Sequence, residues 1–282
     1  MMTQTSNNKW QRVEFRRWQL LGSILAVVLL MAFYSLSDVS HLAHDHVLTA
    51  GDWLGAALCH RITERSLTIA GRQFPLCARC TGMYLGVMLT FIVVGLAGRL
   101  RWGDLPPLRV LLALIGFVVV MGVDGINSYT HFFPEFPHLY TPHNWLRLLT
   151  GMGTGLAMGL ATIPMLAQTL WRLDVYRPVV GSFRELLVVL AVAGTAVLLL
   201  LSNQPIINYV LALVSTAGVI TIVTAINTIL LLTILRKDGL AMRWRETAVP
   251  LTIGLTLAII ELSTITYVRL YFTGTIIGIP GL

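Results

Sequence analysis

Long apolar stretches separated by short polar segments fill the chain from residue 19 onward. Most of them extend for about 18 residues or more, the length that an α-helix needs to cross the hydrocarbon core of a bilayer. The pattern predicts seven membrane-spanning helices, at residues 19–37, 81–98, 107–126, 145–170, 185–202, 205–235 and 248–272. We therefore expect an all-α integral membrane protein, folded as a seven-helix transmembrane bundle.

The composition narrows the class of protein further. Of the 282 residues, 56% are apolar and 12% are charged, and the mean hydropathy is +0.76. These values exclude a soluble enzyme and a disordered chain, and three cysteines are too few for a disulfide-stapled secreted module. Although the net charge is +7, no basic run is interleaved with aromatic residues, so nucleic acid is not an expected partner.

Basic residues alternate between the loops and predict the orientation. Fourteen of the 20 Lys and Arg residues lie before the first span or in every second loop after it. The positive-inside rule then predicts an inner N-terminus and an outer C-terminus. Short loops and the lack of a sorting signal favour the plasma membrane of a prokaryote. The expected parts are a cytoplasmic segment at 1–18, a four-span unit at 19–170 with an outer loop at 38–80, and a three-span unit at 183–282. The first span is longer than the apolar run of a signal peptide and is expected to remain as an anchor.

All cysteines and histidines of the chain fall in the two long loops predicted on the outer face. They are Cys59, Cys77, Cys80, His41, His44, His46, His60, His131, His138 and His143. The three histidines at 41–46 resemble a small metal-collecting patch, although histidines at a membrane surface also serve as ordinary interfacial side chains. The clustering indicates that the chemistry lies on the outer face.

The first loop is expected to bring the cysteines together. Residues 52–58 predict a short amphipathic helix that ends before Cys59. Apolar and polar residues then alternate on both sides of Ala70 and Gly71, which predicts a hairpin that returns the chain to Cys77. Cys77 and Cys80 form a Cys-x-x-Cys, a pattern typical of a metal knuckle in which backbone N–H groups point at both thiolates.

With Cys59, this knuckle predicts a zinc-type site whose fourth ligand is open. His60 is the nearest candidate; the alternatives are His44, His46, His131, His138 and His143, which would leave His60 as a general base. Three other interpretations use the same thiols: a redox pair activated by Arg79, a structural disulfide with one spare cysteine, and inert buried thiols.

These residues resemble a widespread prokaryotic family of polytopic membrane proteins of unknown function, with a Cys-His…Arg-Ser…Cys-x-Arg-Cys-x-Gly-x-Tyr-x-Gly signature. The matching residues are Cys59, His60, Arg65, Ser66, Gly71, Gln73, Pro75, Cys77, Arg79, Cys80, Gly82, Tyr84 and Gly86. Residues 144–151 are similar to the family's second block, and Asp124 to an acidic residue at the end of the span before it. The resemblance covers about residues 55–160 and implies a site, but it brings no established reaction.

Polar residues at the ends of the predicted spans are expected beside the cysteine loop. Asp124 and Asn127 end the third span, while Asn144, Arg147 and Thr150 begin the fourth. Arg147, with Arg65 and Arg79, is a candidate for binding a phosphate or carboxylate, because guanidinium groups recognise such anions in a bidentate manner. The simpler alternatives are that Arg147 snorkels to the interface or pairs with Asp124, and that Arg61 and Arg65 pair with Asp52 and Glu64.

Two further patterns concern helix packing and a membrane acid. Glycines recur every four residues at 82 and 86 and at 151, 155 and 159, which predicts that the second and fourth spans touch and bring Cys80 near Arg147.

Glu261 lies inside the last span, where a carboxylate needs a partner or a cavity. Asn227, Thr224 and Thr228 are the candidate partners, and a substrate or ion pathway is the functional alternative.

These features predict a protein that binds an anionic substrate on the outer face, including lipid-linked anions. A metal site, with zinc as cofactor, would organise an arginine-lined pocket for this substrate. The metal ligands would be Cys59, His60, Cys77 and Cys80. The substrate-binding residues would be Arg65, Arg79, Asn144, Arg147 and Glu261, and His60 or Asp124 would handle protons as catalytic groups. The expected partners are membrane lipid and this substrate. The alternatives are a membrane thiol–disulfide oxidoreductase using Cys77 and Cys80, and a transporter of a metal or small ion.

Overall fold

The computed structural model describes residues 46–278 apart from 134, 136 and 173–175. The first predicted span, at 19–37, and the residues His41 and His44 lie outside this range. Within it, six helices are long and apolar enough to cross a membrane: α3 (Ala78–Leu96), α4 (Leu108–Thr130), α5 (Asn144–Leu170), α6 (Phe183–Leu201), α7 (Pro205–Ile234) and α8 (Trp244–Thr273). The all-α membrane class is therefore confirmed, while the count of seven spans and their orientation stay predictions.

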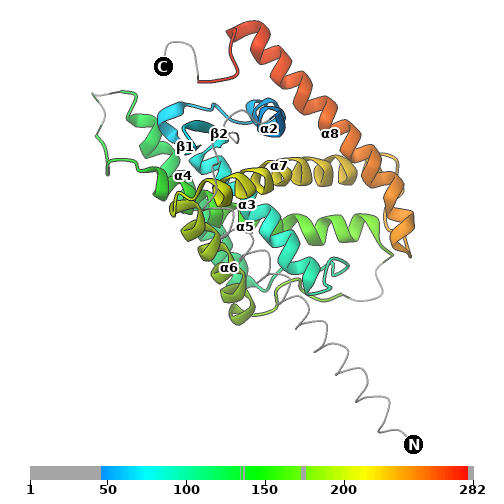
Figure 1. Cartoon of the computed structure of the whole chain (residues 1–282). Coiled ribbons are helices and arrows are strands. Elements are labelled where there is room, and N and C mark those ends of the chain that lie inside the picture. The colour runs from blue at the N-terminus through cyan, green and yellow to red at the C-terminus, as the bar shows by residue number, and fades with distance from the viewer. Residues whose placement is uncertain (1–45, 134, 136, 173–175, 279–282) are drawn as a thin grey trace, which may run out of the picture.

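The centre of the fold is the pair α3 and α5, which lie directly against each other (Figure 1). The reason is the glycine pattern, since a Cβ added at Gly86 would lie 2.7 Å from the carbonyl oxygen of Met152. A Cβ at Gly159 would lie 2.7 Å from the Cβ of Thr90, and Gly82, Gly151 and Gly155 also face backbone of the opposite helix. Small residues allow this close approach of two backbones. The predicted contact between the second and fourth spans is confirmed.

The remaining helices surround this pair unequally. α7 packs closely on α3, where Gly218 faces the backbone of Tyr84, and α4 packs on α5. α8 packs mainly on α7, where Gly254 meets Thr228, and it reaches the loop helix α2 (His46–Ala56) near its other end. Figure 1 shows α8 along one side of the bundle. One apolar core joins α3 and α5 to α6 and α7 through buried side chains such as Leu85, Leu156 and Val189.

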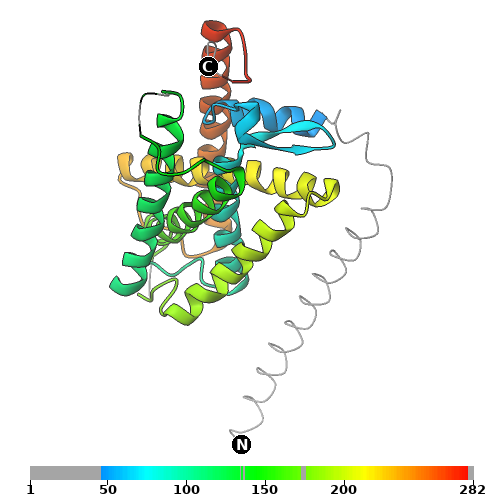
Figure 2. The ribbon, with the colours of Figure 1, turned by 90° about the vertical axis from the view of Figure 1, so that its left-hand side faces the viewer.

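A small module covers the end of the bundle where α3 begins. It consists of α2, the single turn η2 (Thr63–Arg65), and the antiparallel strands β1 (Ser66–Ile69) and β2 (Arg72–Cys77). Ala70 and Gly71 make the turn with positive φ values of 48° and 83°. Figure 2 shows α2 and the hairpin side by side at this end. The predicted hairpin is confirmed.

The helix of this module differs from the prediction in where it begins. It already includes His46, the first residue that the structure describes, so Asp52 lies within the helix rather than at its start. Asp52 is used as an ion-pair partner for two arginines instead of as a cap. The helix ends at Ala56, and the chain turns into Cys59 through bonds from the N–H groups of Leu58 and Cys59 to the carbonyl of Gly55.

Candidate metal centre and arginine cluster

Three separate segments bring the three cysteines together at the start of α3. Cys59 follows α2, Cys77 ends β2 and caps α3, and Cys80 lies in the first turn of α3. Their Sγ atoms all lie within 4.8 Å of one another, and Cys59 and Cys77 are only 4% and 3% exposed. None of the three forms a disulfide. Zinc holds sulfur ligands at about 2.3 Å in a tetrahedral arrangement, which places neighbouring sulfurs about 3.8 Å apart. The cluster therefore suits a metal ion.

Hydrogen bonds already favour a negative charge on one of the sulfurs. The backbone N–H of Cys77 donates to the Sγ of Cys59 over 3.2 Å. The side chain of Cys77 also lowers the pKa of Cys59 through a hydrogen bond, while the same interaction raises the pKa of Cys77 to about 12. The three cysteines thus favour one thiolate, which the other two side chains stabilise by hydrogen bonds. Removing all three protons would require a cation among the sulfurs, which is the condition that a bound metal satisfies.

The fourth ligand is not supplied by His60 in this arrangement. The Nδ1 atom of His60 accepts a hydrogen bond from the N–H of Ile62 over 3.1 Å, and its ring lies beside the cysteine group rather than in it. Burial lowers the pKa of His60, Cys59 opposes this shift, and the nearby positive charges of three arginines reinforce it. Within the described part of the chain, no other His, Cys, Asp or Glu joins the three sulfurs.

Arg269, near the end of α8, holds the loop that carries Cys59. Its guanidinium donates to the carbonyl oxygens of Ala56, Cys59 and His60 over 2.8, 2.5 and 3.1 Å, and to that of Gly278 over 2.7 Å. In the sequence, Arg269 stands eight residues after Glu261 on the last predicted span. Its real partners are carbonyl groups about two hundred residues earlier, and no spacing along the chain reveals such a contact.

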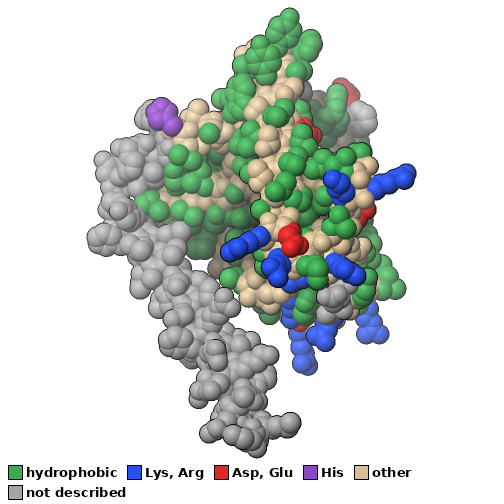
Figure 3. All heavy atoms as spheres, turned by 90° about the vertical axis from the view of Figure 1, so that its right-hand side faces the viewer, with side chains coloured by type: hydrophobic (Ala, Val, Ile, Leu, Met, Phe, Trp, Pro, Cys, Tyr) green, Lys and Arg blue, Asp and Glu red, His purple; other side chains and the backbone are tan. Residues whose placement is uncertain are grey.

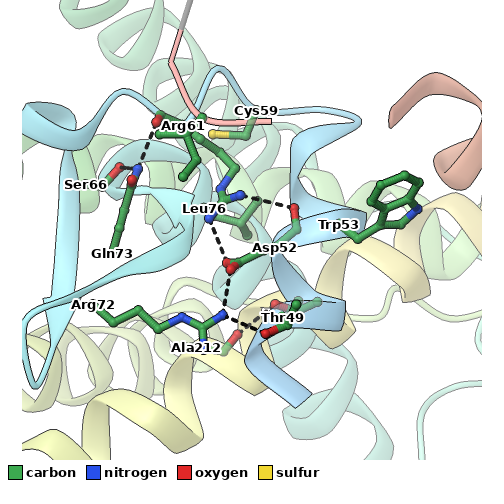
Figure 4. Close-up of polar contacts among 12 residues, drawn as sticks. Thr49, Asp52, Trp53, Cys59, Arg61, Ser66, Arg72, Gln73, Leu76 and Ala212 are labelled. Carbon is green, nitrogen blue, oxygen red and sulfur yellow. Dashed lines mark hydrogen bonds and ion pairs between the residues drawn. The ribbon is translucent and has the colours of Figure 1, made fainter. Parts of the chain in front are cut away.

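A second arginine, which is buried, fixes the other side of the same loop (Figure 4). Arg61 is 1% exposed and pairs with Asp52 over 2.7 Å, while Arg72 pairs with the second oxygen of Asp52 over 2.6 Å. Gln73 donates to the carbonyl of Arg61 over 2.8 Å and to the hydroxyl of Ser66 over 2.9 Å. The expected pair of Arg61 with Asp52 is confirmed. The hairpin, α2 and the Cys59 loop are thereby joined by one polar network.

A separate polar cluster surrounds Asp124, which is 1% exposed near the end of α4. One carboxylate oxygen accepts from Arg79 and from the hydroxyl of Thr150, and the other accepts from the hydroxyl of Tyr140 over 2.8 Å. Arg79 is the residue before Cys80, so the metal knuckle and this cluster share the first turn of α3. Tyr140 comes from the loop before α5 and was not singled out from the sequence.

Ser128, also missed from the sequence, is the meeting point of three arginines. Its hydroxyl accepts from Arg79 over 3.1 Å and from the Nε of Arg147 over 3.4 Å, and its carbonyl accepts from Arg65 over 3.1 Å. Arg65 therefore extends toward α4, with its guanidinium 3.9 Å from the ring centre of Phe132, rather than forming an ion pair with Glu64. Three guanidinium groups thus converge beside the cysteines, and Asp124 is the carboxylate that pairs with them among the described residues.

Asn144 ties this cluster to the loop module. Its amide donates to the carbonyl of Glu64 over 3.0 Å, and its oxygen accepts from Arg147 over 2.8 Å. Arg147 is 7% exposed, so it is buried in the bundle rather than extended to an interface. Asn127 orders the loop before α5 through bonds with Leu139 and Tyr140. The polar ends of α4 and α5 therefore lie beside the cysteine loop, as their positions in the sequence predicted.

Glu261 is the candidate residue that the fold does not bring to this cluster. It lies on an exposed face of α8, two turns before Arg269, and accepts a hydrogen bond from Asn227 of α7 over 3.1 Å. Asn227 was one of the partners that the sequence suggested. The pair joins α7 and α8, and a role of Glu261 in binding the same substrate remains a prediction.

Comparisons with known proteins identify the family to which the chain belongs. An uncharacterized protein of Methanothermobacter thermautotrophicus is 32% identical over 110 residues, which cover 37% of this chain and 84% of the relative. An uncharacterized protein of Methanocaldococcus jannaschii is 26% identical over 115 residues, or 41% of this chain and 67% of that relative. No solved structure matches the chain. The model of the family described as "Predicted membrane protein (DUF2085)" matches residues 59–161, which contain all three cysteines and the arginines around Ser128. The chain therefore belongs to this family of predicted membrane proteins.

Proposed function

We propose that Cys59, Cys77 and Cys80 bind a zinc-type metal ion that organises the arginine cluster as a binding site for an anionic substrate. The observation that carries this proposal is the placement of three cysteine sulfurs within 4.8 Å of one another, next to three guanidinium groups that converge on Ser128. A buried set of thiols beside buried positive charge is costly unless each has a function or a partner.

The metal would act on the arginines through the first turn of α3. Cys77 and Cys80 bracket Arg79, so fixing both sulfurs also fixes the backbone from which Arg79 extends. The carbonyl of Arg79 lies against Gly151 of α5, one turn after Arg147. A metal bound at the knuckle therefore stabilises the relative position of two of the three guanidinium groups.

The charge balance supports an anion as the ligand. Arg65, Arg79 and Arg147 carry three positive charges, and the carboxylate of Asp124 offsets one of them. The Nε of Arg79 is buried and has no hydrogen-bond partner among the described residues, so a donor remains available. Guanidinium groups bind phosphates and carboxylates with paired hydrogen bonds. A lipid-linked anion fits because the cluster lies where membrane-spanning helices end.

Cys59, Cys77 and Cys80 would hold the ion, and a zinc-type ion with three protein ligands would supply Lewis-acid chemistry to the substrate. His60 lies beside the cysteines, and because its Nδ1 accepts from the N–H of Ile62, the neutral ring carries its proton on Nε2; we propose that it donates this proton to a hydrogen bond with the ligand. Asp124 has both oxygens engaged by Arg79, Tyr140 and Thr150, so we propose that it positions Arg79 instead of transferring protons. The positive-inside pattern supports an outward site in the plasma membrane.

Equilibrium binding of inorganic pyrophosphate to the detergent-solubilised full chain tests the proposal. Arg147→Gln should retain the metal but weaken pyrophosphate binding by about tenfold or more, since hydrogen bonds to charged groups contribute about 1.5–3 kcal/mol. Cys80→Ser should lose the metal and also weaken pyrophosphate binding.

Arg184→Gln, an exposed arginine at the start of α6, is the matched control and should change neither property. Equal pyrophosphate affinity in the wild type, Arg147→Gln and Arg184→Gln would refute the anion site even if the metal is present.

A further inference from the structure

A second candidate site lies at the opposite end of the bundle, between α5 and the first third of α8. It is a cavity of about 520 Å³ whose walls come from α3, α5, α7 and α8. On α8, the lining residues Trp244, Ala248, Leu251, Thr252 and Leu255 share one helical face. Because Trp244, Thr252 and Leu255 are exposed, the cavity opens to the exterior of the bundle. Its volume is within the range of about 300–1,000 Å³ that ligand pockets occupy.

The wall of the cavity is mainly apolar, although the buried hydroxyl of Thr224 has no hydrogen-bond partner among the described residues. Its side chains are largely aliphatic or aromatic, and the hydroxyls of Thr221 and Thr252 bond to the backbone carbonyls four residues before them. Trp171 and Trp244 meet edge to face at its end, with their ring centres 4.6 Å apart. Tryptophan is enriched at the headgroup level of membranes. A hydrocarbon chain that enters between the helices from this level matches the cavity.

Arginines surround the same end of the cavity. The guanidinium of Arg101 lies 4.4 Å from the ring centre of Trp171 and donates to the carbonyl of Met242. Arg172 follows Trp171 in the chain, and Arg243 and Arg245 flank Trp244. These four arginines are exposed, and none of them forms an ion pair within the described part of the chain. Figure 3 shows Lys and Arg side chains gathered toward the lower part of this side of the molecule. Nearby Glu246 is occupied by the N–H groups of Met242 and Arg243.

We infer that this cavity binds the acyl chain of an anionic phospholipid whose phosphate contacts Arg101 and Arg243. Basic pockets between membrane helices are typical binding sites for acidic lipid headgroups. A second copy of the chain fits less well, because a symmetric dimer in a membrane would bring two identical groups of arginines to the same level. The predicted span at 19–37 also fits less well as the occupant. It is preceded by Lys9, Arg12, Arg16 and Arg17, so it would bring further positive charges next to these arginines. The inference is independent of the metal site, which lies near the other end of α8.

Native mass spectrometry of the full chain, released from micelles with equal amounts of phosphatidylglycerol and phosphatidylcholine of identical acyl chains, tests the inference. The wild type should retain phosphatidylglycerol in preference to phosphatidylcholine. A basic residue near an anionic headgroup contributes a factor of about five, so Arg101→Gln and Arg243→Gln should each reduce the preference by about that factor. Ala248→Trp, which fills the cavity, should reduce retention of both lipids.

The controls separate the lipid site from general damage and from the metal site. Arg184→Gln removes one exposed basic residue away from the cavity and should keep the wild-type preference, as should Cys80→Ser. The metal content of Arg101→Gln and Arg243→Gln should equal that of the wild type, because their change is remote from the cysteines. Three results would overturn the inference. The wild type could retain the two lipids equally, both arginine variants could show the same preference as Arg184→Gln, or a lipid-free dimer could be the sole species.

Discussion

The two ends of the bundle both carry arginines, but most of those arginines have different surroundings at each end. At the cysteine end, Arg61 and Arg147 are 1% and 7% exposed and are held by side chains and carbonyls from several elements. At the other end, Arg99 pairs with Glu185, but Arg172 and Arg245 are exposed and have no ion pair among the described residues. Exposed arginines of this kind report topology and attract acidic lipids. Buried arginines with several partners are held in fixed positions by the fold, which indicates a preorganised site.

The largest effect in this comparison is expected from Asp52→Ala. The change leaves Arg61 buried without its carboxylate, and removing one partner of a buried ion pair costs about 3–5 kcal/mol. Thermal unfolding in detergent should show a midpoint lowered by several degrees. Arg101→Gln, the control from the exposed end, should leave the midpoint nearly unchanged; equal midpoints for the two variants would contradict the distinction drawn between the ends.

A smaller effect is expected from Arg269→Gln, and it should appear as a loss of metal affinity. Glutamine cannot donate to four carbonyls at once, so the loop that carries Cys59 loses the bonds that hold it. Supporting contacts of this type change metal affinity by about 10–100-fold. Competition with a chelator measures this loss.

Arg245→Gln is the matched control, because it changes an exposed arginine at the other end of α8. Unchanged metal affinity in Arg269→Gln would show that the contacts from α8 do not position the site.

The smallest effect concerns the contact between α3 and α5 that connects the two ends. In Gly86→Ala the new methyl group would lie 2.7 Å from the carbonyl of Met152, and such overpacking costs about 1–3 kcal/mol. Gly116→Ala, in α4, has no atom within 4 Å of the new methyl group and should be tolerated. Unfolding midpoints of the two variants test this contrast, and a tolerated Gly86→Ala would mean that the helices are less closely packed.

The fold was predictable where a local repeat determines it. Apolar runs located the six described spans, the glycine repeat located the contact of α3 with α5, and alternation around Ala70 and Gly71 located the hairpin. The start of α2 was predicted wrongly, since Asp52 looks like a cap in the sequence but is an ion-pair partner in the fold. A capping preference is weak compared with a buried pair.

The candidate site was predictable only in part, for a different reason. The cysteines share a short loop, so their spacing indicated their convergence. Ser128, Tyr140 and Arg269 act through contacts with residues distant in the chain, and a serine, a tyrosine and a carbonyl-binding arginine carry no pattern that reveals such partners. His60 is next to Cys59 in sequence, yet neighbouring residues point in different directions, and its ring bonds to Ile62 instead of joining the sulfurs.

The most direct test of the central claim is the metal content of the full chain, measured by elemental mass spectrometry after purification without a chelating step. We expect about one zinc-type ion per chain in the wild type and in Arg147→Gln, and none in the double variant Cys77→Ser/Cys80→Ser. A folded wild-type protein that contains no metal would contradict the account. If a disulfide between Cys77 and Cys80 then formed reversibly, thiol redox chemistry would replace metal binding as the function of the cluster.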